Sequence, residues 1–188
     1  GENMSETLID PTFHLKIKNK TIPSVEYQEY RRKWKENPQN FVVGDFPIHI
    51  DLEVSTSCNL KCFMCFQSFD PPIPKKMETE TFQKIVDEGT QKGLCALKTQ
   101  YRGEPLIDPR MADLVKYAKE KGVLEAMFNT NATLLTEETA KKLIEEGLDK
   151  LICAVDGYTK DIYESVRIGY NFEVDLNNVK GLKLLNKD

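Results

Sequence analysis

The chain has 188 residues, of which 40% are hydrophobic and 30% are charged, and its 26 Lys and Arg against 30 Asp and Glu leave a net charge of −4. This composition predicts one soluble domain with a sizeable core. It offers no basic stripe to neutralise phosphates, so nucleic acid is not an expected partner, and no charge-free run approaches the roughly 20 residues that span a bilayer. The first residues carry acids and no apolar signal core, so a cytoplasmic protein is expected.

Three of the five cysteines, Cys58, Cys62 and Cys65, form a CxxxCxxC motif. An odd count with this clustering does not fit a disulfide framework. Thiolates are soft ligands and a short loop can turn several of them toward one centre, so the motif predicts a metal site in a reducing compartment. Cys95 and Cys153 fall in strand patterns and are expected to be buried thiols.

Taken in chain order, residues 1–47 predict an N-terminal arm with one helix over residues 24–37. From Ile48 the pattern becomes the two-residue alternation of a strand, with Asp51 and Glu53 on its polar face. Three further strands are expected over residues 94–101, 123–129 and 150–155. Helices are expected to begin near Thr79, Asp108, Thr136, Thr159 and Asp175, and the first three of them to end at Gly93, Gly122 and Gly147.

The later strands begin every 27 to 29 residues, which is typical of serial βα units. Right-handed crossovers then predict a parallel sheet, with ligands beyond the carboxyl ends of its strands. We therefore expect an α/β fold in which residues 48–188 form a partial (β/α) barrel of about four parallel units. The fourth strand is expected to expose an unpaired edge.

The cysteine loop follows the first of these strands, so its thiols are expected at the ligand-binding end of the sheet. A cubane iron–sulfur cluster has four irons, and three thiolates leave one iron free to bind a small molecule. The alternative is a structural zinc, which usually takes four protein ligands. His49 or Cys153 would then have to supply the fourth ligand.

With four later segments, the cysteine motif resembles the radical S-adenosylmethionine (SAM) superfamily, whose signature is CxxxCxxC after the first strand of a partial (β/α)6 barrel. Residues 101–105 resemble the family's GGEP motif, with Arg102 in place of the first Gly, and residues 129–131 resemble the segment near the SAM ribose. Residues 154–157 resemble the SxDG of the SPASM-type and molybdenum-cofactor-type branches, with Ala154 in place of Ser. Arg167 lies where that branch has an Arg that pairs with the SAM carboxylate. The chain is thus similar to the N-terminal part of the family core.

This resemblance implies two cofactors, a [4Fe–4S] cluster held by Cys58, Cys62 and Cys65, and SAM. The residue types suit SAM, because an amino acid head needs acceptors for its ammonium group and a guanidinium for its carboxylate, and a ribose diol suits Asn side chains. No catalytic acid or base is identified. The SAM-binding residues implied are Gly103, Glu104, Pro105, Asn129, Asn131, Asp156, Arg167 and Met64.

The implied activity is reductive cleavage of SAM to a 5′-deoxyadenosyl radical that abstracts hydrogen from a substrate, with an electron from flavodoxin or ferredoxin. Peptide or protein modification is the expected outcome, and carbohydrate or small-metabolite modification by the same chemistry is the alternative. A non-catalytic metal-binding module is the rival from another class of protein. Because relatives carry later strands and further cysteines, the chain is expected to be a fragment of a longer enzyme, or else a short variant that needs a partner.

Overall fold

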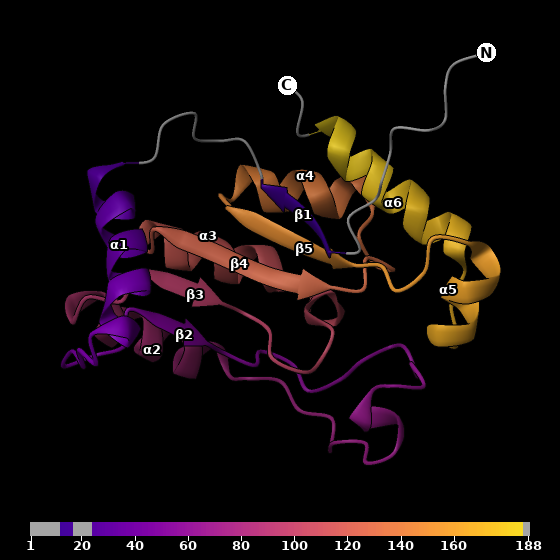
Figure 1. The fold of residues 1–188 in the computed structure, drawn as a ribbon, viewed down its shortest axis with the longest axis horizontal. Helices are drawn as coiled ribbons and strands as arrows, with labels where there is room; N and C mark the ends of the chain where they lie inside the picture. Colours follow the sequence, from indigo (N-terminus) through magenta and orange to yellow (C-terminus); the bar gives the residue numbers. More distant parts are fainter. Residues whose placement is uncertain (1–11, 17–23, 186–188) are drawn as a thin grey trace.

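A computed structural model describes residues 12–16 and 24–185 as an α/β fold built on one sheet (Figure 1). The five strands lie in the order β1-β5-β4-β3-β2. Strands β2 to β5 are parallel, as expected, and β1 runs antiparallel to β5. The strands are β1 (Thr12–Lys16), β2 (His49–Asp51), β3 (Ala96–Lys98), β4 (Glu125–Thr130) and β5 (Lys150–Ala154).

Helices α2, α3 and α4 cover one face of the sheet (Figure 1). The core lies between them and the strands, where Leu97, Phe128 and Leu151 are fully buried. None of the helices that the structure describes is long and apolar enough to cross a membrane. The helices are α1 (Val25–Gln39), α2 (Thr79–Gln91), α3 (Met111–Glu120), α4 (Glu137–Glu145), α5 (Lys160–Val166) and α6 (Phe172–Leu185), with short 3₁₀ turns η1 (Phe66–Ser68) and η2 (Pro105–Ile107).

The face of the sheet away from α2, α3 and α4 carries charged side chains on β2 and β3. Asp51 on β2 and Lys98 on β3 form an ion pair of 3.5 Å across it, in agreement with their pairing in the parallel register. Successive strand residues point to opposite faces, so the next polar-face positions toward the carboxyl ends belong to Glu53 and to Asn129. The polar-face prediction for Asp51 and Glu53 agrees with this arrangement.

Helix α1 lies across the end of the sheet where the parallel strands begin (Figure 1). Ser24 caps it by accepting a hydrogen bond of 3.2 Å from the Tyr27 backbone. Tyr27 then donates from its hydroxyl to the Glu125 carboxylate at 2.8 Å, and Tyr30 is only 1% exposed. This packing leaves the opposite, carboxyl end of the strands as the place for a site. Residues 1–11 and 17–23 of the expected arm lie outside the described residues.

The expectation of an open edge at the fourth parallel strand is wrong. Strand β1 pairs with β5 along its whole length, from Thr12 opposite Ala154 to Lys16 opposite Lys150. The arm thus supplies an edge strand as well as a helix. The sequence analysis missed it because the strand pairs with residues more than a hundred positions away, which no local pattern reports.

Helix boundaries follow the capping chemistry of individual residues. Thr136 and Thr159 cap α4 and α5 as expected, and Gly147 ends α4 with a φ of +90°, a conformation that favours glycine. The predicted start of α3 at Asp108 is wrong, because that carboxylate holds the backbone and side chain of Arg110 and the helix begins at Met111. Helix α2 begins at Thr79 as expected, although Glu78 and not Thr79 is its N-cap. Helix α6 begins earlier than expected, at Phe172, and the Asn171 side chain accepts from the Glu173 amide.

Helix α6 buries a carboxyl group that has no hydrogen-bond partner within the described structure. Asp175 is 3% exposed, and neither of its side-chain oxygens is paired. Burial raises the pKa of Asp175 from 3.8 to about 7, with a smaller contribution from the negative charge of Glu104. The folded chain therefore holds this proton more tightly than the unfolded chain does. Folding must become less favourable as the pH rises from about 4 to about 7, and the cost is fully present above pH 7.

We expect Asp175→Asn to remove this pH dependence. One pKa unit corresponds to about 1.4 kcal/mol, so between pH 5 and pH 8 the wild type should lose about 3 kcal/mol of unfolding free energy relative to the variant. Urea unfolding at the two pH values measures the difference. Asp161→Asn, which changes an exposed acid in the first turn of α5, is the matched control and should follow the wild type. Parallel pH profiles for wild type and Asp175→Asn would contradict the assignment.

Candidate functional site

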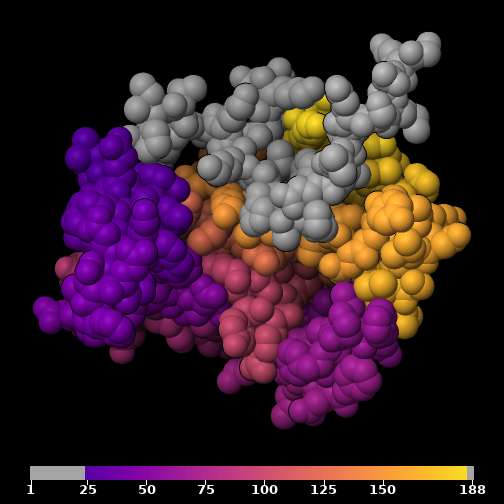
Figure 2. Space-filling model, in the orientation of Figure 1, coloured from indigo at the N-terminus to yellow at the C-terminus, as the bar shows by residue number. Residues whose placement is uncertain are grey.

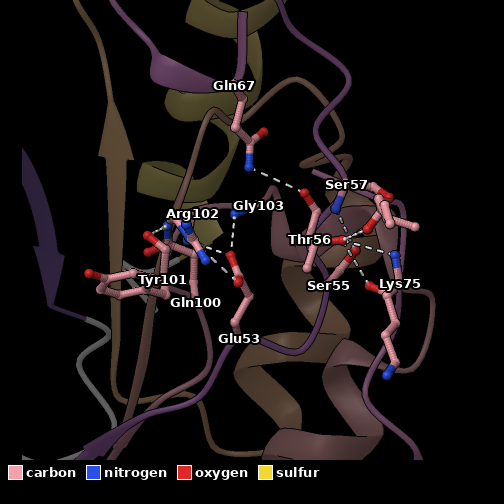
Figure 3. Close-up of polar contacts among 11 residues, drawn as sticks. Glu53, Ser55, Thr56, Ser57, Gln67, Lys75, Gln100, Tyr101, Arg102 and Gly103 are labelled. Atoms are coloured by element: carbon pink, nitrogen blue, oxygen red, sulfur yellow. Dashed lines mark hydrogen bonds and ion pairs between the residues drawn. The ribbon is translucent and has the colours of Figure 1, made fainter. Parts of the chain in front are cut away.

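The cysteine loop leaves the sheet after β2 and leads to α2. Hydrogen bonds between the first and last residues of the loop hold its two ends together. Val54 accepts a backbone hydrogen bond of 2.9 Å from Met77, and the Thr56 hydroxyl lies between the Ile73 carbonyl and the Lys75 amide, each at 2.9 Å. Gln67 reaches back from the loop to the Thr56 carbonyl at 3.2 Å (Figure 3). The loop is therefore held where it begins and ends, and by one side-chain hydrogen bond from its middle.

Tight turns shape the part of the loop that carries the thiols. The Cys65 amide donates to the Cys62 carbonyl at 3.0 Å, and Ser68 donates its hydroxyl to the same carbonyl at 2.8 Å. Cys65 then precedes the 3₁₀ turn η1. These bonds place all three cysteines on one compact loop, as expected from their spacing. In the space-filling view this loop lies beside α5 (Figure 2).

The three thiols are free and differ in exposure. Cys58 is exposed, whereas Cys62 and Cys65 are half-buried. Desolvation raises the pKa of the Cys58 and Cys62 thiols, and the charge of Arg167 acts in the opposite direction on both. Within the described residues, no three His, Cys, Asp or Glu side chains are arranged closely enough to hold a metal ion. Binding a metal would therefore require the thiols to rotate toward one another.

The end of β3 packs tightly against the end of β2. Glu53 accepts backbone hydrogen bonds from Arg102 at 2.9 Å and Gly103 at 3.1 Å (Figure 3). A Cβ atom at Gly103 would lie 2.0 Å from the Ser55 carbonyl oxygen, so only glycine fits this approach. The Arg102 guanidinium lies over the rings of Phe66 and Tyr101, at 5.3 and 5.4 Å. The Glu53 carboxylate therefore holds the loop after β3.

Glu104 is a buried carboxylate, 3% exposed, that connects the end of β3 to the end of β4. Its Oε1 accepts from the Leu106 amide at 3.0 Å and the Thr130 hydroxyl at 2.7 Å, and its Oε2 accepts from the Asn131 amide at 2.7 Å. Desolvation raises the pKa of Glu104, and these hydrogen bonds oppose the rise. Pro105, the next residue of the motif, is buried at the start of η2.

The two asparagines at the end of β4 have different surroundings. The Asn129 side-chain oxygen is buried and has no hydrogen-bond partner among the described residues. Every polar group of the Asn131 side chain is engaged, with Asn59, Thr133 and the Cys58 sulfur as partners. Asn129 is therefore the one of the two whose oxygen is open to a ligand.

Asp156 and Arg167 form an ion pair between the end of β5 and the end of α5. The Nε and Nη2 atoms of Arg167 lie 2.8 and 2.6 Å from one carboxylate oxygen of Asp156, and the Arg167 side chain is 6% exposed. The residues on either side of Arg167 accept from the cysteine loop, Val166 from Phe63 and Ile168 from Lys61, each at 3.2 Å. This places the guanidinium beside the thiols.

Apolar side chains surround the loop, but the structure does not bury them. Met64 is 50% exposed, Phe63 is 56% exposed and Phe69 is 78% exposed, so these side chains shield the thiols from solvent only in part. The alternative ligands for a structural zinc lie elsewhere. His49 contacts Trp34 and Asp51 where β2 begins, and Cys153 is fully buried in the core. Cys95 is half-buried rather than buried.

Sequence reasoning missed three residues that build the site. Thr130 holds Glu104, and Asn59 and Thr133 bind the side chain of Asn131. Asn59 lies between two of the cysteines, and its position in the motif is the one signal that pointed to it. Thr130 lay inside the recognised segment 129–131 without being given a role, and Thr133 gave no signal, because a threonine beside a strand end is most often a local cap.

The chain is similar to a known protein family and to individual known proteins. The Radical SAM superfamily model matches residues 52–187. The tungsten-containing aldehyde ferredoxin oxidoreductase cofactor-modifying protein of Pyrococcus furiosus is 35% identical over 111 residues, which are 57% of this chain and 30% of that protein. A probable GTP 3′,8-cyclase of Methanococcus maripaludis is 29% identical over 123 residues, 65% of this chain and 41% of that protein.

The fold is shared with solved structures of low sequence identity. SuiB of Streptococcus suis, crystallised with its precursor peptide SuiA, superposes with a TM-score of 0.64 at 16% identity, covering 85% of this chain and 35% of that one. The chain spans less than half the length of each of these three proteins. The family model begins directly after β2 and covers the cysteine loop, strands β3 to β5 and well over half of the chain. The chain therefore belongs to the radical SAM superfamily.

Proposed function

We propose that this chain forms the cofactor-binding part of an enzyme that cleaves SAM reductively at a [4Fe–4S] cluster held by Cys58, Cys62 and Cys65. The observation that carries the proposal is the placement of the three thiols on one loop beside the carboxyl ends of β2 to β5. Three thiolates leave one iron of a cubane without a protein ligand. When bound, the reduced cluster supplies the electron that splits SAM into methionine and a 5′-deoxyadenosyl radical.

Three features of the strand ends fit SAM beside the thiols. The buried Asn129 oxygen has no partner in the described structure and needs a hydrogen-bond donor, which a ribose hydroxyl supplies. Arg167 uses Nε and Nη2 on Asp156, which leaves Nη1 for a carboxylate. Gly103 lets the backbone after β3 pack directly on the backbone after β2, which fixes the segment that would face the SAM amino group.

The SAM contacts stay predictions, and the structure suggests how each group would act. Glu104 and Pro105 fix the backbone that faces the amino group, Asp156 orients Arg167, and half-exposed Met64 offers an apolar surface to adenine. Asn131 holds the cysteine loop against the end of β4. We place the electron donor, flavodoxin or ferredoxin, at the exposed cysteine loop, and five free thiols favour a reducing compartment such as the cytoplasm.

We expect anaerobic reconstitution with iron and sulfide to give about four irons per chain. Changing any one of Cys58, Cys62 or Cys65 to Ala should abolish the cluster, because two thiolates are too few to hold it and the other two cysteines lie outside the loop. Iron and sulfide analysis with the visible spectrum measures this outcome. Cys95→Ser and Cys153→Ala are the matched controls and should keep their iron. Stoichiometric zinc without sulfide in protein purified without oxygen would favour the metal-binding module instead.

Arg167→Ala should weaken SAM binding to the reconstituted protein by roughly ten- to a hundred-fold, since a charge-assisted hydrogen bond contributes about 1.5 to 3 kcal/mol. Arg167→Lys should also bind SAM more weakly. The lysine ammonium is a point charge without the planar fork of arginine, so it cannot bind Asp156 and the SAM carboxylate at the same time. Calorimetry with SAM measures both. The control is Arg110→Lys, which alters the Arg110 fork on Asp108 away from the thiols. Unchanged affinity in both Arg167 variants would remove this residue from the SAM site.

We further propose that the substrate is a peptide or protein. SuiB, a structural neighbour, is crystallised with its precursor peptide, and the apolar residues exposed around the cysteine loop offer a surface for an extended chain. The second candidate is a small molecule, which the match to a probable GTP 3′,8-cyclase supports. The same radical chemistry acts on both, so the two candidates differ only in the class of substrate that binds beside the proposed cofactors.

Hydrogen transfer distinguishes the two substrate classes. The reconstituted protein is incubated with SAM, dithionite and a deuterated cell extract separated by size, and deuterium in 5′-deoxyadenosine is measured by mass spectrometry. A peptide or protein substrate should give deuterium transfer from the large fraction, and protease treatment of that fraction should abolish it. Transfer from the small-molecule fraction alone would contradict the peptide proposal and support the second candidate.

A further inference from the structure

The end of β4 holds the first cysteine through a closed ring of three side chains. Asn131 donates from Nδ2 to Asn59 Oδ1 at 2.9 Å, Asn59 donates from Nδ2 to Thr133 Oγ1 at 2.7 Å, and the Thr133 hydroxyl donates to Asn131 Oδ1 at 2.8 Å. Each side chain in this ring donates one hydrogen bond to the next side chain and accepts one from the previous side chain. The ring therefore fixes which side of each amide carries nitrogen, because reversing either asparagine would place like groups together.

The ring also fixes where the second hydrogen of the Asn131 amide points. One N–H of Nδ2 is used on Asn59, and the same nitrogen lies 4.0 Å from the Cys58 sulfur, at the outer limit of an N–H···S contact. Asn131 is 8% exposed and Thr133 is 4% exposed, so water competes little for these bonds. The backbone of Asn131 is held in turn by Glu104 at 2.7 Å. The amide nitrogen is thus aimed at Cys58 by contacts on both its side chain and its main chain.

We propose that Asn131 is a positioning residue that donates a hydrogen bond to the Cys58 thiolate and thereby raises the reduction potential of the cluster. Hydrogen bonds to cluster sulfurs stabilise the more negative, reduced state. The role rests on the proposed cluster at Cys58, Cys62 and Cys65. Its effect is measured without SAM or substrate, which separates it from the SAM contact that the family resemblance implies for Asn131.

The test is a redox titration of the reconstituted, SAM-free protein followed by electron paramagnetic resonance. Asn131→Asp removes the donor and adds negative charge, so its potential should become more negative by about 59 mV, a tenfold change in the one-electron equilibrium. Asn131→Ala should shift in the same direction. Asn178→Ala is the matched control, since Asn178 donates to the Ala132 carbonyl beside the ring without reaching a cysteine, and its potential should equal that of the wild type.

If the Asn131 variants do not assemble a cluster, Thr133→Val provides a second test. It removes the hydroxyl that orients the Asn131 amide and leaves the amide itself in place, so a smaller shift in the same direction is expected. Equal potentials for wild type, Thr133→Val and any Asn131 variant that binds four irons would overturn the role of Asn131. Absence of iron and sulfide from the wild type would instead overturn the proposed function, so the two failures are distinguishable.

Discussion

The buried carboxylate of Glu104 is the constraint on which the arrangement of the strand ends depends. An unpaired carboxylate in this position would be costly, and three hydrogen bonds from Leu106, Thr130 and Asn131 offset its desolvation. Hydrogen bonds to charged groups contribute about 1.5 to 3 kcal/mol each, so together they are strong enough to hold the ends of β3 and β4 at a fixed distance. The backbone amide of Glu104 donates to the Ser57 carbonyl at 2.8 Å, which extends the constraint to the chain that follows β2.

The cysteine loop depends on this framework from two sides. On one side Asn59 and Cys58 meet the β4 end through Asn131, and on the other Lys61 and Phe63 bond to the chain around Arg167. Tyr170 connects the two sides by donating to the Thr133 carbonyl at 2.9 Å. Metal sites in small domains often form only when the metal binds, because the ligands are scattered in the unfolded chain. Here the backbone of the loop is already held by protein contacts, and what remains for the metal is to gather the thiol side chains.

The sequence predicted the parts of the fold that local chemistry decides. The parallel strands follow from alternation and regular spacing, and caps such as Thr136 and Thr159 follow from side-chain oxygens before a helix. The three cysteines were found because their spacing is itself the signal. Strand β1 was missed because its pairing with β5 is long-range, and the Asn131 ring was missed because it joins residues 59, 131 and 133 across two loops. Asp175 was expected to begin the last helix, yet it lies inside that helix with a buried side chain that has no hydrogen-bond partner in the described structure.

Arg167 shows how the protein limits the cost of a buried charge next to a binding site. A buried guanidinium without a partner would destabilise the fold by several kcal/mol, so Asp156 is needed before any ligand arrives. Asp156 contacts only one edge of the guanidinium, through Nε and Nη2, so the SAM carboxylate that we propose would have to bind at Nη1. An arginine has donors on two edges and could bind both carboxylates, whereas a lysine at this position could not.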